Sequence, residues 1–420
     1  MPRPIALQRS ALIEAISHLT RGLELVQGIP DESNRAELEL ELQASLAPAL
    51  TAARGYAAAE VEQTYARART LCDQLSNSPQ LFPVLYGLFI FHWCRGHLQT
   101  AQDGASEMLD IALRAGDPAL QLIGHGALGE ITWHIGDNKT ALDHLNEAYS
   151  RYDENVHALH ASVYGLDFGV MVLSYLDSAQ LVLGYPDRSL QAGNQAVALA
   201  RRLKHPVILC SALGFGVTNM LYRRDPSVLL KLADECVAMA GELGFPHWIG
   251  MATAYRGWAL AQLGAAEDGI NQVRQGISTW RATGADVALG CYLAALSESQ
   301  LVGHHAEAAL SSADEAIAWV ERNGEGQWKT LAHCCRGDAL LALNASDQAR
   351  SEYELALSAA RQQGAKWWEL RAAIHLARLR QCEGKREDAR KILEPIYSWF
   401  GSGFELRDLK EAKALLDELR

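Results

Sequence analysis

The chain has 420 residues, of which 49% are apolar, 21% charged and 7% aromatic, and its formal net charge is −12. This apolar content excludes a disordered chain. The negative charge argues against nucleic-acid binding as the main function, because phosphate contacts need a clustered excess of Lys and Arg. The length exceeds one ordinary domain, so the chain forms either several domains or one long repetitive array.

The first residues lack the features of a targeting segment. The stretch from Ser10 to Val26 is amphipathic and has no continuous apolar h-region, so no signal peptide is expected. The longest apolar runs, such as Leu81 to Phe91, are much shorter than the about 20 residues of a membrane span. The eight cysteines are scattered without a C-x-x-C pair, which favours a reduced setting. We therefore expect a soluble cytoplasmic protein that contacts neither membrane nor nucleic acid.

The sequence contains an internal repeat of about 40 residues. Short polar turns recur at this spacing, with one longer step after the second turn. We expect a helix on each side of every turn, because apolar and small residues recur at helical spacing. The turns are centred on Gly96, Gly136, Gly184, Arg224, Gly264, His304, Asn344 and Gly384.

Further glycines fit the same repeat. Gly129, Gly257 and Gly337 lie seven residues before their turns, where each lets the second helix approach the first closely. Another set lies twenty residues after the turns, and we expect these glycines to end the second helices in the left-handed conformation. They are Gly116, Gly244, Gly284, Gly324 and Gly364.

The helix pair that contains Leu128-Gly129, Ala141, Leu145 and Ala148 resembles the tetratricopeptide repeat. The spacing of 40 departs from the family's usual 34 residues, which affects the repeat subtype and not the stacking of helix pairs. This resemblance implies an all-α, right-handed α-solenoid. We expect residues 1–55 to form N-terminal helices, residues 56–400 the repeat array with an insertion near 151–165, and residues 401–420 a capping helix.

Several blocks of sequence also resemble the tetratricopeptide-rich C-terminal region of large bacterial regulatory proteins that carry an AAA-type ATPase domain, often behind a class III nucleotidyl cyclase domain. The blocks include Arg256 to Leu260, Glu369 to Ala373 and Tyr397 to Phe400. The chain contains no G-x-x-x-x-G-K-[ST] phosphate loop, so the ATPase and cyclase chemistry is not expected here. The resemblance implies a sensor or scaffold part without a cofactor.

The longer step of the repeat places about eight extra residues between Arg151 and Gly165. Insertions in solenoids often belong to a binding surface, and the alternative is a longer loop that caps the following helix. Asp153, His157 and His160 have side chains that suit zinc or iron, but no metal motif is present and we expect no metal. The polar and aromatic residues of this stretch are Tyr152, Asp153, His157, His160, Tyr164 and, just after it, Asp167.

The first helices carry aromatic residues at positions that would face the concave side of a tetratricopeptide array. Trp93 and Trp133 lie one repeat apart, and an aromatic wall with a few polar groups suits a peptide or small-ligand groove. The same tryptophans can instead pack between helices, so both interpretations stay open. The predicted groove residues are Tyr86, Trp93, Glu130, Trp133, His134, Trp258, Glu298, Asp338 and Arg378.

We predict a non-catalytic scaffold that binds a protein or peptide partner in this groove, in bacterial signalling or regulation. Trp93, Trp133 and Trp258 would anchor the partner, and the charged groove residues would orient it. Two alternatives remain. The first is a module that senses a small molecule near residues 152–167. The second is an enzyme with four acid/base candidates, which are His125, His134, Tyr164 and Asp167.

Overall fold

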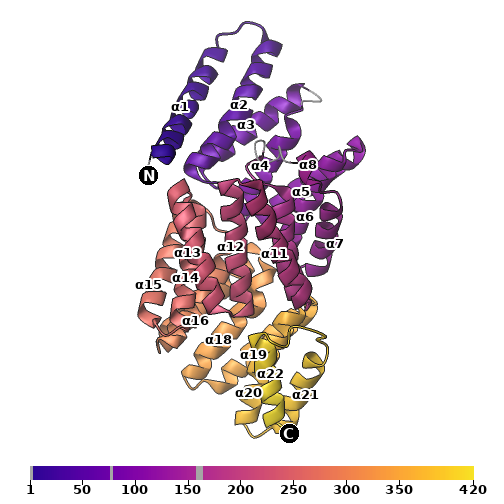
Figure 1. The fold of residues 1–420 in the computed structure, drawn as a ribbon, viewed down its shortest axis with the longest axis vertical. Helices are drawn as coiled ribbons and strands as arrows, with labels where there is room; N and C mark the ends of the chain where they lie inside the picture. The colour runs from indigo at the N-terminus through magenta and orange to yellow at the C-terminus, as the bar shows by residue number, and fades with distance from the viewer. Residues whose placement is uncertain (1–2, 76–78, 158–163) are drawn as a thin grey trace.

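The structure is a computed structural model that describes residues 3–75, 79–157 and 164–420. Within these ranges the chain is all-α and contains no strand, and its helices form a long coil of antiparallel pairs (Figure 1). The N-terminal part comprises α1 (Arg3–Val26), α2 (Glu32–Arg54) and α3 (Ala59–Leu75). The pairs that follow are α4 (Leu81–Cys94) with α5 (Leu98–Ala115), α6 (Pro118–Ile135) with α7 (Asn138–Ser150), α10 (Phe168–Val182) with α11 (Pro186–Leu203) and α12 (Pro206–Arg223) with α13 (Pro226–Leu243).

The second half continues the same arrangement and confirms the predicted all-α solenoid of tetratricopeptide-like helix pairs. A short helix, α8 (Glu154–His157), lies between α7 and α10, and a 3-10 turn, η1 (Gly326–Trp328), precedes α18. The remaining helices are α14 (Pro246–Gln262), α15 (Ala266–Ala282), α16 (Leu289–Val302), α17 (Ala306–Asn323), α18 (Lys329–Ala342), α19 (Ser346–Gln362), α20 (Lys366–Cys382), α21 (Arg386–Tyr397) and α22 (Arg407–Glu418).

The turns between the two helices of each pair share one backbone conformation. All eight predicted turn residues have a positive φ, from 54° at Arg224 to 101° at Gly264. The glycines predicted to end the second helices also have a positive φ, as in Gly116 and Gly244. An L side chain is disfavoured in this conformation. The non-glycine residues Arg224, His304 and Asn344 are therefore retained there at a conformational cost.

Close contacts between the two helices of a pair depend on glycine, as the repeat predicts. A Cβ atom at Gly257 would lie 2.5 Å from the carbonyl oxygen of Gly269 on the facing helix, and one at Gly129 would lie 2.6 Å from Leu145 Cγ. Any side chain at these positions would force the helices apart.

We expect Gly276→Ala to lower the free energy of unfolding by about 1–3 kcal/mol, because the added methyl group would collide with the backbone of α14 at Ala254. Gly104→Ala is the matched control. It also lies inside a second helix, but its Cβ would meet no atom within 4 Å, so we expect a gain of up to about 1 kcal/mol from helix propensity. Urea denaturation of the two variants measures both changes in the free energy of unfolding. Equal changes would contradict the close contact between helices that we assign to Gly276.

The solenoid winds far enough for its second half to contact its first half. The main-chain NH of Asp286 donates to the carbonyl oxygen of Cys94 at 2.8 Å. Arg95 Nη1 donates to the carbonyl oxygen of Gly284, 189 residues away, at 3.1 Å. These contacts join the α4–α5 turn to the segment between α15 and α16, so successive turns of the coil stack on each other.

Stacking of the turns covers the inner face of the coil, which is formed by the first helix of each pair. Helix α10 contacts α20 as well as its neighbours α6 and α12, and every residue from Phe168 to Ala179 is buried. A helix that is buried on all sides is typical of a protein interior, and the polar side chains of this stretch, Ser174, Asp177 and Ser178, each have a hydrogen-bond partner. The inner face is thus packed against the chain itself along much of its length.

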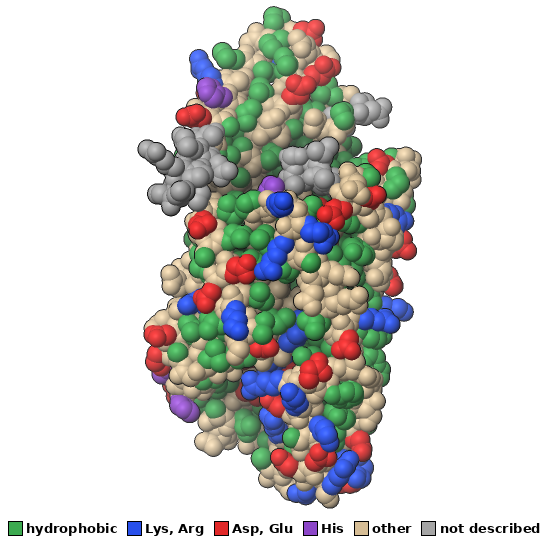
Figure 2. Space-filling view, viewed as in Figure 1, with side chains coloured by type: hydrophobic (Ala, Val, Ile, Leu, Met, Phe, Trp, Pro, Cys, Tyr) green, Lys and Arg blue, Asp and Glu red, His purple; other side chains and the backbone are tan. Residues whose placement is uncertain are grey.

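The outer surface carries charges of both signs. On the face shown in Figure 2, acidic and basic side chains are interspersed and form no single basic patch. In the described ranges, every helix falls short of the length and apolarity that crossing a membrane requires.

Candidate functional site

The predicted groove residues lie on the inner face in two groups, the first mainly aromatic and the second mainly polar. The first group is contributed by α4 and α6. His134 lies between two indoles, with its ring centroid 5.5 Å from that of Trp93 and 4.8 Å from that of Trp133. Trp133 also meets Trp328 edge-on at 5.2 Å. We refer to Trp93, Trp133, His134 and Trp328 as the central cluster.

A buried carboxylic acid adjoins the central cluster. Tyr175 Oη donates to Glu130 Oε1 at 2.9 Å and lies 3.3 Å from His134 Nε2. Since the hydroxyl hydrogen is used on Glu130, this oxygen can accept from an Nε2–H of His134, which leaves His134 Nδ1 as the bare acceptor. Burial raises the pKa of Glu130 to about 8 and lowers the pKa of His134 to about 3. Both groups are therefore uncharged at neutral pH.

The central cluster contains polar atoms that the protein does not satisfy. Within the described part of the chain, no hydrogen-bond partner is found for Nε1 of Trp93, Trp133 and Trp328 or for Nδ1 of His134. Each of these atoms is buried, and an unpaired buried polar atom costs about 1–3 kcal/mol. Such a concentration of three donors and one acceptor is unusual in a packed interior and matches what a bound polar chain could supply.

Tyr86 and Tyr164 lie toward the N-terminal end of the coil, beside α2 and α3. Their rings meet edge-on with centroids 5.3 Å apart, and both line a cavity of about 190 Å³, which we call the N-terminal cavity. Its walls come from α2, α3, α4, residues 164–166 and the starts of α12 and α14. A glycine is required at Gly87 because a Cβ there would lie 2.6 Å from Cε2 of Tyr65 in the wall.

Asp167 serves the local fold. Its Oδ1 accepts from the main-chain NH of Val170 at 2.9 Å, which caps the start of α10, and its Oδ2 accepts from Tyr152 Oη at 3.0 Å. This arrangement matches the capping alternative for the insertion. Of the two histidines predicted there, His160 and the side chain of His157 lie outside the described structure. Among the described side chains, no three of His, Cys, Asp or Glu gather closely enough to hold a metal ion.

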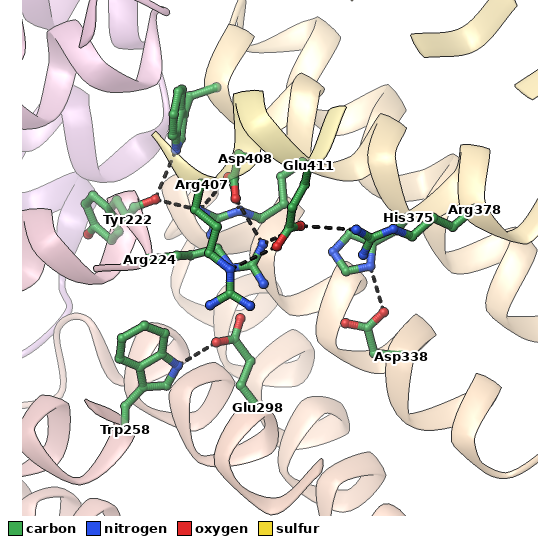
Figure 3. Close-up of polar contacts among 12 residues, drawn as sticks. Tyr222, Arg224, Trp258, Glu298, Asp338, His375, Arg378, Arg407, Asp408 and Glu411 are labelled. Carbon is green, nitrogen blue, oxygen red and sulfur yellow. Dashed lines mark hydrogen bonds and ion pairs between the residues drawn. The ribbon is translucent and has the colours of Figure 1, made fainter. Parts of the chain in front are cut away.

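The second group of predicted residues is polar and lies near the C-terminal end of the inner face (Figure 3). Trp258 Nε1 donates to Glu298 Oε2 at 2.6 Å. Asp338 Oδ1 lies 2.8 Å from His375 Nδ1. Burial opposes ionisation of Asp338, but the charge and hydrogen bond of His375 outweigh it and lower the pKa of this carboxyl.

Helix α22 closes this end of the inner face through two arginines. Asp408 is fully buried, and its carboxylate pairs with Arg224 Nη1 at 3.0 Å and with Arg371 Nη2 at 2.8 Å. Glu411 pairs with the same Arg224 at 3.0 Å and, more weakly, with Arg378 at 3.4 Å. We call Arg224, Arg371 and Asp408 the arginine clasp. It ties the α12–α13 turn to the end of the chain (Figure 3).

The four acid/base candidates have separate partners. His125 Nδ1 lies 2.9 Å from Nδ1 of His144 on α7, whereas His134 belongs to the central cluster. In the described ranges, no hydrogen bond joins any two of His125, His134, Tyr164 and Asp167. Burial and the neighbouring His144 lower the pKa of His125 to about 4. The geometry therefore gives no support to an acid/base pair.

Sequence reasoning missed residues that complete these groups, because they come from repeats one superhelical turn away. Trp328 joins the central cluster from η1, and Arg371 joins the clasp from α20. His247 lines the N-terminal cavity. The run Phe245-Pro246-His247-Trp248, where α14 begins, was an available signal, since it brings three aromatic rings close together in the sequence.

Comparison with known proteins establishes the fold class of the chain and not a family. No known family model matches it. A protein of Rhizobium meliloti (strain 1021), the uncharacterized protein R02095, is 26% identical over 365 residues, which are 85% of this chain and 35% of that protein. The chain thus spans about a third of the length of this relative.

Among the solved structures that share the fold, two Rap proteins align with most of this chain. A Rap protein complexed with Competence and Sporulation Factor is similar with a TM-score of 0.59 and 13% identity, over 92% of this chain and all of that one. The Rap conjugation gene regulator of plasmid pLS20, in complex with the Phr* peptide, has a TM-score of 0.51 and 11% identity over 91% of this chain and 95% of that one. These similarities define the class as a tetratricopeptide-like helical repeat protein.

Proposed function

We propose that this chain is a tetratricopeptide-like module that binds a peptide segment of a partner protein along its inner face. The observation that carries the proposal is the central cluster, where three indole NH groups and one imidazole nitrogen are buried without partners. A peptide backbone presents alternating carbonyl and NH groups, so it would satisfy all four atoms. Of the two Rap structures of similar fold, one is a complex with Competence and Sporulation Factor and the other a complex with the Phr* peptide.

Binding at the central cluster requires the two turns of the coil to separate locally. Trp133 is only 3% exposed and is covered by Trp328. The main-chain contact between Cys94 and Asp286 and the side-chain bond from Arg95 hold the turns together nearby. A bound peptide would replace the Trp133–Trp328 contact with its own side chains and hydrogen bonds.

We further propose that the module belongs to a larger bacterial regulatory system, as its sequence resemblance to the repeat region of ATPase-containing regulators implies. The match to a third of the longer Rhizobium relative supports this placement.

The test is selection of a displayed library of random 12-residue peptides on the full chain, followed by calorimetric titration of the selected peptides. Trp93→Phe combined with Trp133→Phe keeps the aromatic packing and removes two NH donors. We expect this variant to bind selected peptides at least about tenfold more weakly, since each lost hydrogen bond contributes about 1 kcal/mol. Phenylalanine is preferable to alanine, because truncating buried Trp133 would itself cost about 3–5 kcal/mol of stability.

The matched control is Trp399→Phe, since Trp399 is 41% exposed and outside the central cluster. It should bind the selected peptides as the unmodified chain does, and circular dichroism should show the same helicity in all variants. The proposal fails if no peptide is selected, or if the selected peptides bind the double variant and the unmodified chain equally well.

A further inference from the structure

Among the described residues, no Asp, Glu, Lys or Arg lines the N-terminal cavity. The lining consists of aliphatic, aromatic, glycine, proline and threonine residues together with two histidines. Burial lowers the pKa of His247 to about 3, so its imidazole is neutral at physiological pH. An ionised ligand would lose its hydration without gaining a partner of opposite charge, which is strongly unfavourable. The lining therefore selects for an uncharged ligand.

The size and walls of the cavity favour an aromatic ring. A cavity of about 150 Å³ in another protein holds one benzene molecule, so about 190 Å³ accommodates one ring with a small substituent. Tyr56, Tyr65 and Trp248 present aromatic surfaces to this space. Rings pack on such surfaces edge-to-face or offset, with a gain beyond that of apolar burial alone.

Two residues of the wall carry a polar atom that is buried without a partner. Tyr86 is 3% exposed and His247 is 5% exposed, and no hydrogen-bond partner for Tyr86 Oη or His247 Nδ1 is present in the described ranges. His247 is fixed by its neighbours, with its ring 4.1 Å from that of Trp280 and 5.3 Å from that of Tyr56. Neither atom is exposed to the cavity, so a ligand would be held by the apolar and aromatic surfaces of the wall.

We propose that the N-terminal cavity binds an uncharged aromatic small molecule. This site lies beside, and not within, the stretch of residues 152–167 that the sequence suggests for a small ligand. Among the described residues of that stretch, only 164–166 line it, whereas Asp167 and Tyr152 are paired with each other. The cavity and the central cluster use different residues, so binding here does not depend on the proposed peptide function.

The test compares two probes that differ mainly in charge. Methyl 4-hydroxybenzoate is neutral, and 4-hydroxybenzoate carries a carboxylate on the same ring. We expect the full chain to bind the neutral probe with a Kd tighter than about 1 mM and to bind the carboxylate at least about tenfold more weakly. Isothermal calorimetry measures both affinities, and phenol and 4-hydroxyacetophenone extend the neutral set.

Two variants locate the site. Val207→Trp places a large side chain in the space that the ligand needs and should abolish binding. Ala52→Trp places an indole in the same space from an exposed position on α2, so it should not reduce stability, but we expect it to weaken binding of the neutral probe about tenfold. Tyr185→Phe is the matched control, because Tyr185 is 39% exposed and lies outside the cavity.

The proposal is overturned if none of the three neutral probes binds, if the carboxylate binds as tightly as its ester, or if Ala52→Trp and Val207→Trp bind the ester as the unmodified chain does. A result of this kind would leave the peptide experiment unaffected, because that experiment reads binding through Trp93 and Trp133.

Discussion

Replacing Asp408 with Asn is expected to lower the free energy of unfolding by about 3–5 kcal/mol. The carboxylate is fully buried and neutralises Arg371, which is itself only 5% exposed, as well as Arg224. Asparagine keeps the shape of the side chain but removes its charge. Arg371 would then be a buried cation whose remaining partner is the carbonyl oxygen of Tyr222. Urea denaturation followed by circular dichroism measures the loss.

Asp417→Asn is the matched control for this prediction. Asp417 lies on the same helix, α22, and pairs with Lys413 at 3.0 Å, but both side chains are about half exposed. Exposed ion pairs contribute little, so we expect a change below about 1 kcal/mol. If both variants lost the same small amount, the arginine clasp would contribute no more than a surface ion pair.

Stability is expected to fall as the pH rises from 6 to 9, because two carboxylic acids are buried in the protonated form. Burial raises the pKa values of Glu130 and Glu325 to about 8, above the ordinary value of 4.5 for a glutamate. The stabilisation is complete below pH 4.5 and is lost progressively as the pH rises through 8, since only the unfolded chain releases these protons freely. Each of the two carboxyl groups should lower the free energy of unfolding by about 2–3 kcal/mol between pH 6 and pH 9.

Glu130→Gln tests this assignment, because glutamine can still accept the hydrogen bond of Tyr175 but has no proton to release. We expect thermal or urea denaturation to show a shallower loss of stability between pH 6 and pH 9 in this variant than in the unmodified chain. Glu39→Gln is the control. The hydrogen bond from Arg67 lowers the pKa of Glu39, so this substitution should change stability equally at both pH values. A Glu130→Gln profile parallel to that of the unmodified chain would contradict the prediction.

Features within one repeat could be predicted from the sequence. The positive φ at Gly136 and the close approach of α6 and α7 at Gly129 follow from local rules, because only glycine is comfortable in these positions. The regular spacing of such glycines was enough to predict the helix pairs and their stacking. The sequence also predicted Trp93, Trp133 and His134 as groove residues, and these three side chains lie together in the structure.

Contacts between turns of the coil could not be predicted in the same way. Whether Trp133 meets Trp328, or Arg224 meets Asp408, depends on the pitch of the superhelix. The pitch is the sum of small rotations between successive helix pairs, and no single residue determines it. For this reason the sequence left open whether the tryptophans line a groove or pack between helices, whereas the structure shows Trp133 covered by Trp328 from the second turn.

The hydrogen bond between Cys94 and Asp286 also has a consequence for folding. In an open solenoid each repeat contacts only its neighbours, so repeats can unfold one after another from the ends. Here repeats one full turn apart are bonded to each other, which raises the mean sequence separation of contacts. Folding should then be slower than in an open array of the same length, and the two turns should melt together as one cooperative unit.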